Sequence, residues 1–136
     1  MNTLRTGRII FGVMYFIAAI VHLLFGVFNP ASYSGWAENA LLPFYVSFFR
    51  DVVPFYAFAF ALFLAVFEVV LALLILYKGF WVKLGFFLSI VFQILLAPLG
   101  WWGFFNIVLA VVQVIWMRES YPATAFVTEE EKVYAQ

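Results

Sequence analysis

Four apolar runs, separated by short polar or Gly- and Pro-containing stretches, divide this chain. They cover about residues 9–28, 55–77, 82–98 and 103–117. Because roughly 20 helical residues cross a hydrocarbon layer of about 30 Å, the first two runs predict full membrane spans. The last two are shorter, and we expect their ends to extend by a turn. The pattern predicts an all-α integral membrane four-helix bundle in residues 1–118, followed by a polar, mobile cytoplasmic tail in 119–136.

The stretch 29–54 is an outer loop of about 25 residues between the first two runs. Asn29-Pro30 ends the first helix, because proline disfavours helical geometry at the residue before it. Aromatic and apolar residues then predict a short amphipathic helix, interrupted at Pro43, that lies in the membrane interface. A re-entrant or irregular aromatic loop fits this pattern equally well.

Basic residues lie mainly on one side of the four-span topology. That side holds Arg5, Arg8, Lys78, Lys83 and Arg118, and the other side holds only Arg50, beside Asp51. Since cytoplasmic loops carry the excess of Lys and Arg, both termini are predicted to face the cytoplasm. The first apolar run is longer than the core of a signal peptide, about 7–15 residues, so we expect an uncleaved transmembrane helix there.

Composition supports a membrane protein. Of 136 residues, 68% are hydrophobic and 10% are charged, against about 25% charged in soluble domains. Seven basic and seven acidic residues give a formal net charge of zero, and nothing indicates nucleic-acid binding. The absence of cysteine removes disulfides, thiolate metal sites and thiol redox chemistry from this chain.

Each apolar run carries one face of small and polar residues. In the second run Glu68 is the single carboxylate, and it shares a face with Ala57, Ala61, Ala65 and Ala72. The other faces are Gly12, Tyr15, Ala19, His22 and Gly26; Gly85, Ser89 and Gln93; and Asn106, Ala110, Gln113 and Met117. A charge in a membrane span favours a protein or water environment over lipid. These faces are therefore predicted to meet inside the bundle as a thin polar thread.

Helix rise predicts the depth of the polar residues. At about 1.5 Å per residue, Glu68 lies roughly 20 Å from the outer end of its run and Gln93 roughly 16 Å from the inner surface. We therefore expect Glu68 beside Gln93 and Ser89 at mid-depth. His22 and Asn106 are expected to form a separate outer polar layer.

These five residues, Glu68, Gln93, His22, Asn106 and Ser89, are the candidate ligand-binding residues. For Glu68 two interpretations stay open: a neutral carboxyl that only joins helices, and a proton-accepting or ligand-anchoring group. A packing role is favoured for His22 and for the amides. No metal site, catalytic residue or autonomous enzyme is predicted, because no nucleophile–base pair, phosphate loop, metal-ligand cluster or bis-histidine haem motif is present.

Two segments resemble the DoxX-like membrane protein family. RIIFGVMYFIAAIVHLLFG is similar to its first span, and FEVVLALLILYKGFWVKLGFFLSIVF to its second and third. The matching positions are Arg8, Gly12, His22, Glu68, Gly79 and Lys83, whereas Ala18-Ala19 and Val70-Leu71-Ala72 stand where the family usually has glycines. The resemblance implies a four-helix bundle in the plasma (inner) membrane of a prokaryote. Some relatives are associated with quinone-linked oxidoreductase complexes, beside partner subunits that carry the redox cofactor, and more distant ones bind sterol-like or other lipophilic ligands.

The sequence is therefore compatible with two functions. In the first, a DoxX-like subunit in the lipid bilayer binds a quinone or another lipophilic molecule in the bundle interior near Glu68, with a membrane or redox partner subunit. In the alternative, a non-catalytic structural or assembly protein uses its buried polar residues only to fix helix packing. A homo-oligomer through Gly or Ala faces is compatible with both. A transporter is the weaker third hypothesis, because four spans contain no inverted repeat.

Overall fold

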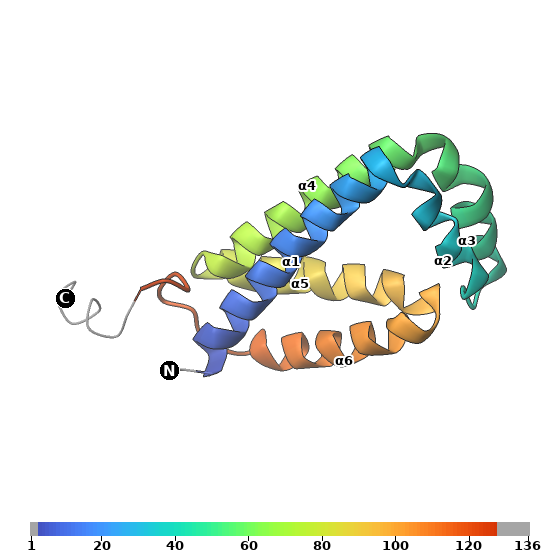
Figure 1. Ribbon diagram of the computed structural model, residues 1–136. Helices are drawn as coiled ribbons and strands as arrows, with labels where there is room; N and C mark the ends of the chain where they lie inside the picture. Colours follow the sequence, from blue (N-terminus) through green and yellow to red (C-terminus); the bar gives the residue numbers. More distant parts are fainter. Residues whose placement is uncertain (1–2, 128–136) are drawn as a thin grey trace.

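The computed structural model describes residues 3–127, and the regular structure in that range is entirely helical. The helices are α1 (Thr3–Phe28), η1 (Pro30–Tyr33), α2 (Gly35–Glu38), α3 (Pro43–Ser47), η2 (Phe48–Val52), η3 (Val53–Tyr56), α4 (Ala57–Leu76), α5 (Phe80–Leu96), η4 (Ala97–Leu99) and α6 (Trp101–Trp116) (Figure 1). The prediction of an all-α chain is confirmed. We call the end with residues 29–56 the outer end, and the opposite end the inner end.

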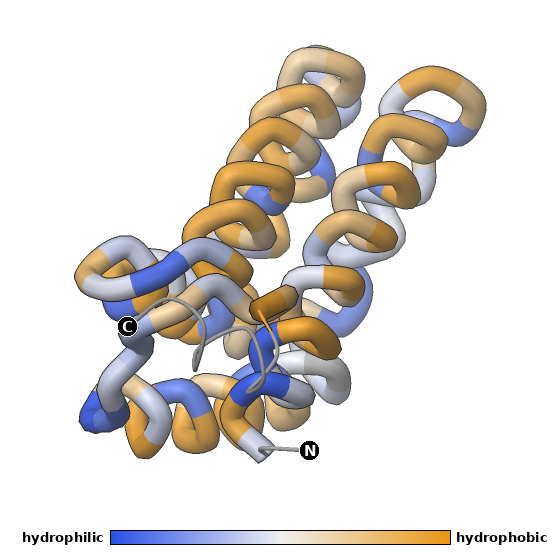
Figure 2. Tube along the Cα trace, turned by 90° about the vertical axis from the view of Figure 1, so that its left-hand side faces the viewer, coloured by the Kyte–Doolittle hydropathy of each residue, from blue (hydrophilic) through white to orange (hydrophobic). Residues whose placement is uncertain are grey.

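Three helical stretches are long and apolar enough to cross a membrane. They are Thr3–Phe28, Pro43–Leu76 and Phe80–Leu99. Large apolar side chains such as Phe55, 83% exposed, and Phe104, 65% exposed, stand on the surface, and Figure 2 shows hydrophobic residues along all the long helices. α6 is apolar too, but its 16 residues rise only about 24 Å. Three of the four predicted spans thus have the required length.

Small residues set the close contact between α1 and α4. A Cβ atom added at Gly26 would lie 2.4 Å from the Cβ of Ala61, and one added at Gly12 would lie 2.7 Å from Leu76. Both distances are too short for a side chain, so the two antiparallel helices approach at glycine. The small-residue faces predicted from the sequence form this interface.

The long helices pack as two pairs, α1 with α4 and α5 with α6, joined by contacts of α4 with α5. Gly85 of α5 lies against Leu74 and Ile75 of α4, near the inner end. From there the two pairs diverge toward the outer end, as both views show (Figures 1 and 2). Pairwise packing is therefore established, and the finer arrangement as a four-helix bundle stays a prediction.

The outer segment forms five short helical pieces between Pro30 and Tyr56, where one interrupted helix was predicted. Pro43 stands in the first turn of α3 and Pro54 in the first turn of η3, positions where the missing N–H group breaks no helical hydrogen bond. The segment reaches the α5 end through two bonds: Leu41 N donates to Pro98 O (2.8 Å) and Tyr45 Oη donates to Leu95 O (2.7 Å). It therefore links the two diverging pairs at the outer end.

Arg8 closes the inner end. Its guanidinium donates to the carbonyl oxygens of Ile75 (2.9 Å), Leu76 (3.2 Å) and Tyr77 at the end of α4, and to that of Ala123 (3.2 Å). The last carbonyls of a helix have no partner within the helix and carry partial negative charge, so an arginine satisfies them well. We call this arrangement the Arg8 clamp.

The segment that follows α6 packs against the same end. Tyr121 and Ala125 are buried, Gly79 N donates to Tyr121 O (2.7 Å), and Ala125 N donates to Leu76 O (2.9 Å). Residues of the predicted mobile tail within 119–127 therefore pack against the inner end, through backbone bonds and the Arg8 clamp. The rest of the predicted tail, 128–136, lies outside the described residues.

Candidate functional site

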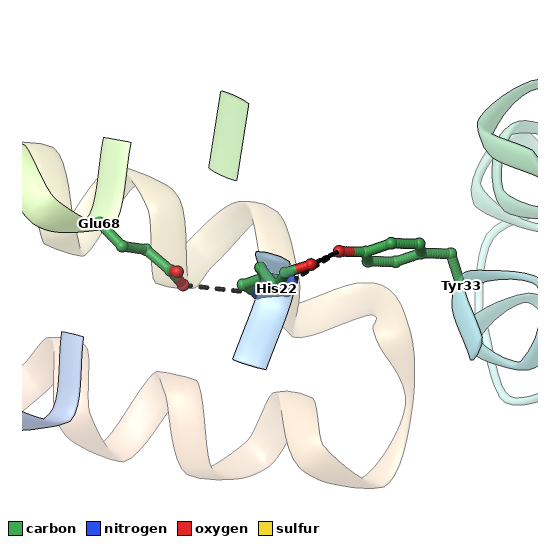
Figure 3. Close-up of polar contacts among 3 residues, drawn as sticks. All are labelled: His22, Tyr33 and Glu68. Atoms are coloured by element: carbon green, nitrogen blue, oxygen red, sulfur yellow. Dashed lines mark hydrogen bonds and ion pairs between the residues drawn. The ribbon is translucent and has the colours of Figure 1, made fainter. Parts of the chain in front are cut away.

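Glu68 and His22 meet in the interface between α1 and α4. Oε1 of Glu68 lies 3.5 Å from Nε2 of His22, and the two side chains are only 3% and 12% exposed (Figure 3). On its other side His22 Nδ1 is 3.0 Å from the hydroxyl oxygen of Tyr33, and that hydroxyl donates to the His22 carbonyl oxygen at 3.3 Å. The three residues form a continuous series, which we call the Glu68–His22–Tyr33 chain.

The Tyr33 hydroxyl anchors the His22 ring from the side away from Glu68. Burial, with a further contribution from the charge of Glu68, raises the pKa of Tyr33 to about 12, so this residue is a neutral phenol near pH 7. Its oxygen lies within hydrogen-bond distance of both Nδ1 and the carbonyl oxygen of His22, and Nε2 of the same ring faces Oε1 of Glu68.

The contact between His22 and Glu68 contradicts their predicted separation in depth. Gly12 lies opposite Leu76 and Gly26 lies opposite Ala61. This register places His22 level with about residue 65, one turn from Glu68. Counting from the two run ends overestimated the separation, because α1 ends at Phe28 while the second run reaches further outward. Side chains also lean toward the N-terminus of their own helix, so these two lean toward each other across antiparallel helices.

A second cluster joins α1 to α5. Gln93 Nε2 donates to Tyr15 Oη (3.1 Å) and to Ser89 Oγ (3.3 Å), and the hydroxyls of Tyr15 and Ser89 are hydrogen-bonded to each other. All three residues are buried. Gln93 and Ser89 thus lie together as predicted, but their partner is Tyr15 and not Glu68. Tyr15 was recognised as part of the polar face of its helix and missed as a site residue.

The two clusters are neighbours along α1. Tyr15 and His22 are seven residues apart, which is two helical turns on one face and a rise of about 10 Å. α4 contributes Glu68 to one cluster, and α5, which packs against α4, contributes Gln93 to the other. The seven-residue spacing in the sequence was the signal that could have identified Tyr15.

Asn106 stands on α6. It is half-buried on α6 and lines an apolar pocket of about 200 Å³ with Trp36, Leu96 and Leu99. Trp36 in turn presents its ring edge-on to His22, with centroids 5.8 Å apart. Trp36 therefore contacts His22 and lines the same pocket as Asn106.

Four buried polar atoms in residues 3–127 have no hydrogen-bond partner. They are Glu68 Oε2, Gln93 Oε1, and both Oε1 and Nε2 of Gln113. Leaving such an atom unsatisfied costs about 1–3 kcal/mol, and native structures contain few of them. One residue from each of α4, α5 and α6 carries these atoms. The interior of the protein therefore contains polar groups that could form further hydrogen bonds.

The part of the chain that the structure describes contains no cluster of side chains that could together bind a metal ion. There, no three His, Cys, Asp or Glu side chains are close enough to share an ion. What the described residues do offer is a buried contact between two ionisable side chains, Glu68 and His22, and hydrogen bonding by the buried amides and hydroxyls.

Comparison of the chain with models of known protein families gives no match, and neither does comparison with curated proteins or with solved structures. The fold and the site define the class at a coarser level: an all-helical protein with three helices long and apolar enough to cross a membrane. The resemblance to DoxX-like proteins stays a proposal. Any function must be argued from the geometry of the site.

Proposed function

We propose that this protein is a small integral membrane protein, a DoxX-like subunit, that binds a quinone or another lipophilic molecule with a polar head near Glu68. The observation that carries the proposal is Glu68 Oε2, a buried carboxylate oxygen with no hydrogen-bond partner. A carboxyl group in an apolar interior is costly, and a ligand that bonds to it would offset part of this cost.

The apolar surroundings support a hydrophobic ligand body. A groove of about 300 Å³ between α1 and α4 is lined by apolar side chains. Its walls include Ala19 and Ala65, each three residues and about one turn from His22 and Glu68. Binding sites of small molecules are mostly apolar, with a few placed polar groups, and this combination of groove and polar pair fits that description.

The proposed topology has four helices across the inner membrane of a prokaryote and both termini in the cytoplasm. It is supported at the inner end, where Arg5 near one end of the chain donates to Ala125 O (2.9 Å) near the other. Termini at one end fit an even number of passes, so the proposal includes α6 as a crossing helix beside α1, α4 and α5. Its flanking tryptophan Trp101 suits the headgroup region.

The Glu68–His22 pair supplies what a redox-linked site would need from this chain. It brings two ionisable side chains within 3.5 Å of each other next to the place proposed for the polar head, and protons must be taken up or released when a quinone changes redox state. The electrons would come from a partner subunit that carries the redox group. The chain's own part is to bind, to orient and to hold the proton.

A structural role is the second candidate, and the Tyr15–Ser89–Gln93 cluster favours it. These residues bond α1 to α5, which are not consecutive helices, and such bonds fix helix positions without any ligand. In that case Glu68 would add to packing through His22 alone.

Binding and stability of the Glu68→Gln variant separate the two candidates. The full-length protein in mild detergent is titrated with a decyl-substituted benzoquinone, and its thermal unfolding is recorded. We expect Glu68→Gln to change the affinity by about tenfold, since one bond to a charged group is worth about 1.5–3 kcal/mol. The matched control is Glu38→Gln, at an exposed carboxylate of the outer segment. Unchanged binding and unchanged stability in Glu68→Gln would refute the ligand role.

Native mass spectrometry of the purified protein gives an independent test. A quinone or another lipophile co-extracted at one molecule per chain supports the ligand role. A protein that carries no small molecule and binds no probe supports the structural role.

A further inference from the structure

We infer that the inner end carries a site for an anionic phospholipid, with an acyl chain in an apolar pocket beside α1 and α4 and the phosphate head among basic side chains. This inference rests on the membrane insertion in the proposed function, and it does not depend on the ligand near Glu68. It follows from the position of one pocket relative to Arg5, Arg8 and Lys78.

The pocket lies where α1, the end of α4 and the segment after α6 meet (Figure 1). Its volume is about 350 Å³, and it is lined by Phe16, Leu73, Leu76, Tyr77, Thr124 and Phe126. Of the described residues, only Phe16 also lines the groove between α1 and α4 near Glu68. Leu73 is 57% and Phe126 64% exposed, so the pocket can be entered from the surrounding lipid.

Two arginines are bonded to the walls of this pocket. Arg5 donates to the carbonyl oxygens of Ala125 (2.9 Å) and Phe126 (3.3 Å). Arg8 donates to the carbonyl oxygen of Tyr77, on the wall that α4 contributes. The guanidinium groups therefore hold the walls in place and bring two positive charges to the inner end of the pocket.

Lys78 adds a third positive charge at the same place, because it directly follows Tyr77 of the lining and is exposed. Within residues 3–127 the inner end holds one acidic side chain, Glu119, and the acidic residues 129–131 lie outside the described range. The basic side chains of that end are Arg5, Arg8, Lys78, Lys83 and Arg118. Clusters of this kind beside membrane helices attract anionic lipid heads.

The depth of the pocket fits one leaflet of the bilayer. Phe16 lies eight residues beyond Arg8 on α1, a rise of about 12 Å, and each leaflet contributes about half of a hydrocarbon layer of about 30 Å. A chain in the pocket would therefore run from the headgroup level toward the middle of the bilayer. A soluble anion would leave the apolar lining uncovered, whereas a phospholipid matches both the lining and the charges.

The test compares two phospholipids that share their chains and differ in the charge of the head. The full-length protein in mild detergent is titrated with dioleoyl phosphatidylglycerol and, separately, with dioleoyl phosphatidylcholine, and bound lipid is counted by native mass spectrometry. We expect the phosphatidylglycerol to bind about tenfold more tightly, because basic side chains act on its net charge. Equal affinities, or tighter binding of the phosphatidylcholine, overturn the inference and leave the proposed function in place.

The same head without chains separates a lipid site from a site for a free phosphate. Glycerophosphoglycerol carries the charge of phosphatidylglycerol but has nothing to place in the pocket. We expect no binding of this probe at the concentrations that saturate the lipid. Binding as tight as that of the lipid would show that the apolar pocket plays no part, and would overturn the inference.

Two charge variants locate the head. Lys78→Gln removes a positive charge beside the lining and should reduce the preference for phosphatidylglycerol several-fold. Arg118→Gln is the matched control, because this exposed basic residue belongs to the same end and is not among the described lining residues. It should keep the wild-type ratio. An equal reduction in both variants would assign the attraction to the whole basic end and refute a site at the pocket.

A wall variant locates the chain. Phe126→Ala removes apolar surface from the pocket without changing any charge, so it should weaken both lipids by the same factor and keep their ratio. Unchanged affinities would place the chain elsewhere and refute the pocket as its site. The wild-type ratio of the two lipids decides the inference even where a variant fails to fold.

Discussion

His22 reaches Glu68 across two antiparallel helices, with Nε2 of the ring 3.5 Å from Oε1 of the carboxyl group. Tyr33 of η1 bonds to the other ring nitrogen of His22, and Tyr15 lies two turns further along α1, bonded to Gln93. The pair itself is buried, with Glu68 3% and His22 12% exposed. Its stability should depend on both members being present.

Removing one member of the Glu68–His22 pair should lower the stability of the protein more than removing both members. His22→Leu leaves Glu68 buried and unpaired, and loss of one partner of a buried pair costs about 3 kcal/mol or more. The double variant His22→Leu with Glu68→Leu should be more stable than His22→Leu alone, since it buries no lone carboxyl group. Chemical unfolding in mild detergent, followed by far-UV circular dichroism, measures the difference. Additive losses in the double variant would contradict direct coupling.

Gly26 should tolerate no side chain. A Cβ atom there would lie 2.4 Å from Ala61 Cβ, so Gly26→Ala must push α1 and α4 apart, and overpacking of this kind costs about 1–3 kcal/mol. Adding Ala61→Gly removes the colliding atom and should restore much of the melting temperature. Gly35→Ala is the matched control, because nothing lies within 4 Å of a Cβ at that position. Equal melting temperatures for Gly26→Ala and Gly35→Ala would show that the interface is looser than described.

Arg8→Lys should open the inner end although it preserves the charge. One lysine ammonium cannot reproduce the fork of N–H groups that serves Ile75, Leu76, Tyr77 and Ala123. Amide exchange at Gly79 and Ala125, whose N–H groups are bonded at this end, should become faster in the variant. Arg118→Met, at an exposed side chain, should leave exchange at both amides unchanged. Slow exchange in Arg8→Lys would mean that backbone bonds alone hold the segment.

Stability should fall at high pH because two tyrosines are buried. Burial raises the pKa of Tyr33 to about 12, and raises that of Tyr121 to about 12 against the opposing effect of Arg8. The unfolded chain loses these protons near the ordinary tyrosine pKa of 10.0, so between pH 10 and 12 it binds fewer protons than the folded chain. Their contribution is then complete below pH 10 and is lost as pH rises toward 12.

Melting temperature measured between pH 9 and 12 tests this pH dependence. Tyr33→Phe and Tyr121→Phe should each flatten the decline, since phenylalanine has no proton to lose. Tyr56→Phe, at a side chain that is 67% exposed, should keep the wild-type slope. A wild-type melting temperature that is constant or rises over this range would show that the two phenols titrate alike in the folded and unfolded chains.

Periodicity predicted the elements and faces of this protein better than it predicted their contacts. Alanine spacing placed Glu68 on the interfacial face of α4, because a face depends only on residues within one helix. The partner of Glu68 depended on the register between two helices, which is set by where Gly12 and Gly26 allow close approach. Counting residues from run ends cannot supply that register, and so it assigned Gln93 in place of His22.

The same limit applies to Arg8 and to the outer segment. Arg8 fitted the charge rule for cytoplasmic loops, whereas its burial follows from carbonyl groups 67 to 69 positions away, which no local pattern reveals. Proline and aromatic residues between Pro30 and Tyr56 fitted an interrupted helix and an irregular loop equally well. Contacts with the α5 end select the short helical pieces that are observed.

The Arg8 clamp also orders the assembly of the chain in time. Arg8 precedes its partner Ala123 by 115 positions, and the rest of α1 and all of α4, α5 and α6 lie between them. The α1–α4 pair, with the bonds from Arg8 to the end of α4, can form while later helices are still being synthesised, but the bonds to Ala123 O and from Ala125 N need the segment after α6. Completing the inner end therefore has to wait for that segment, and a chain arrested before Tyr121 would keep this buried arginine only partly bonded.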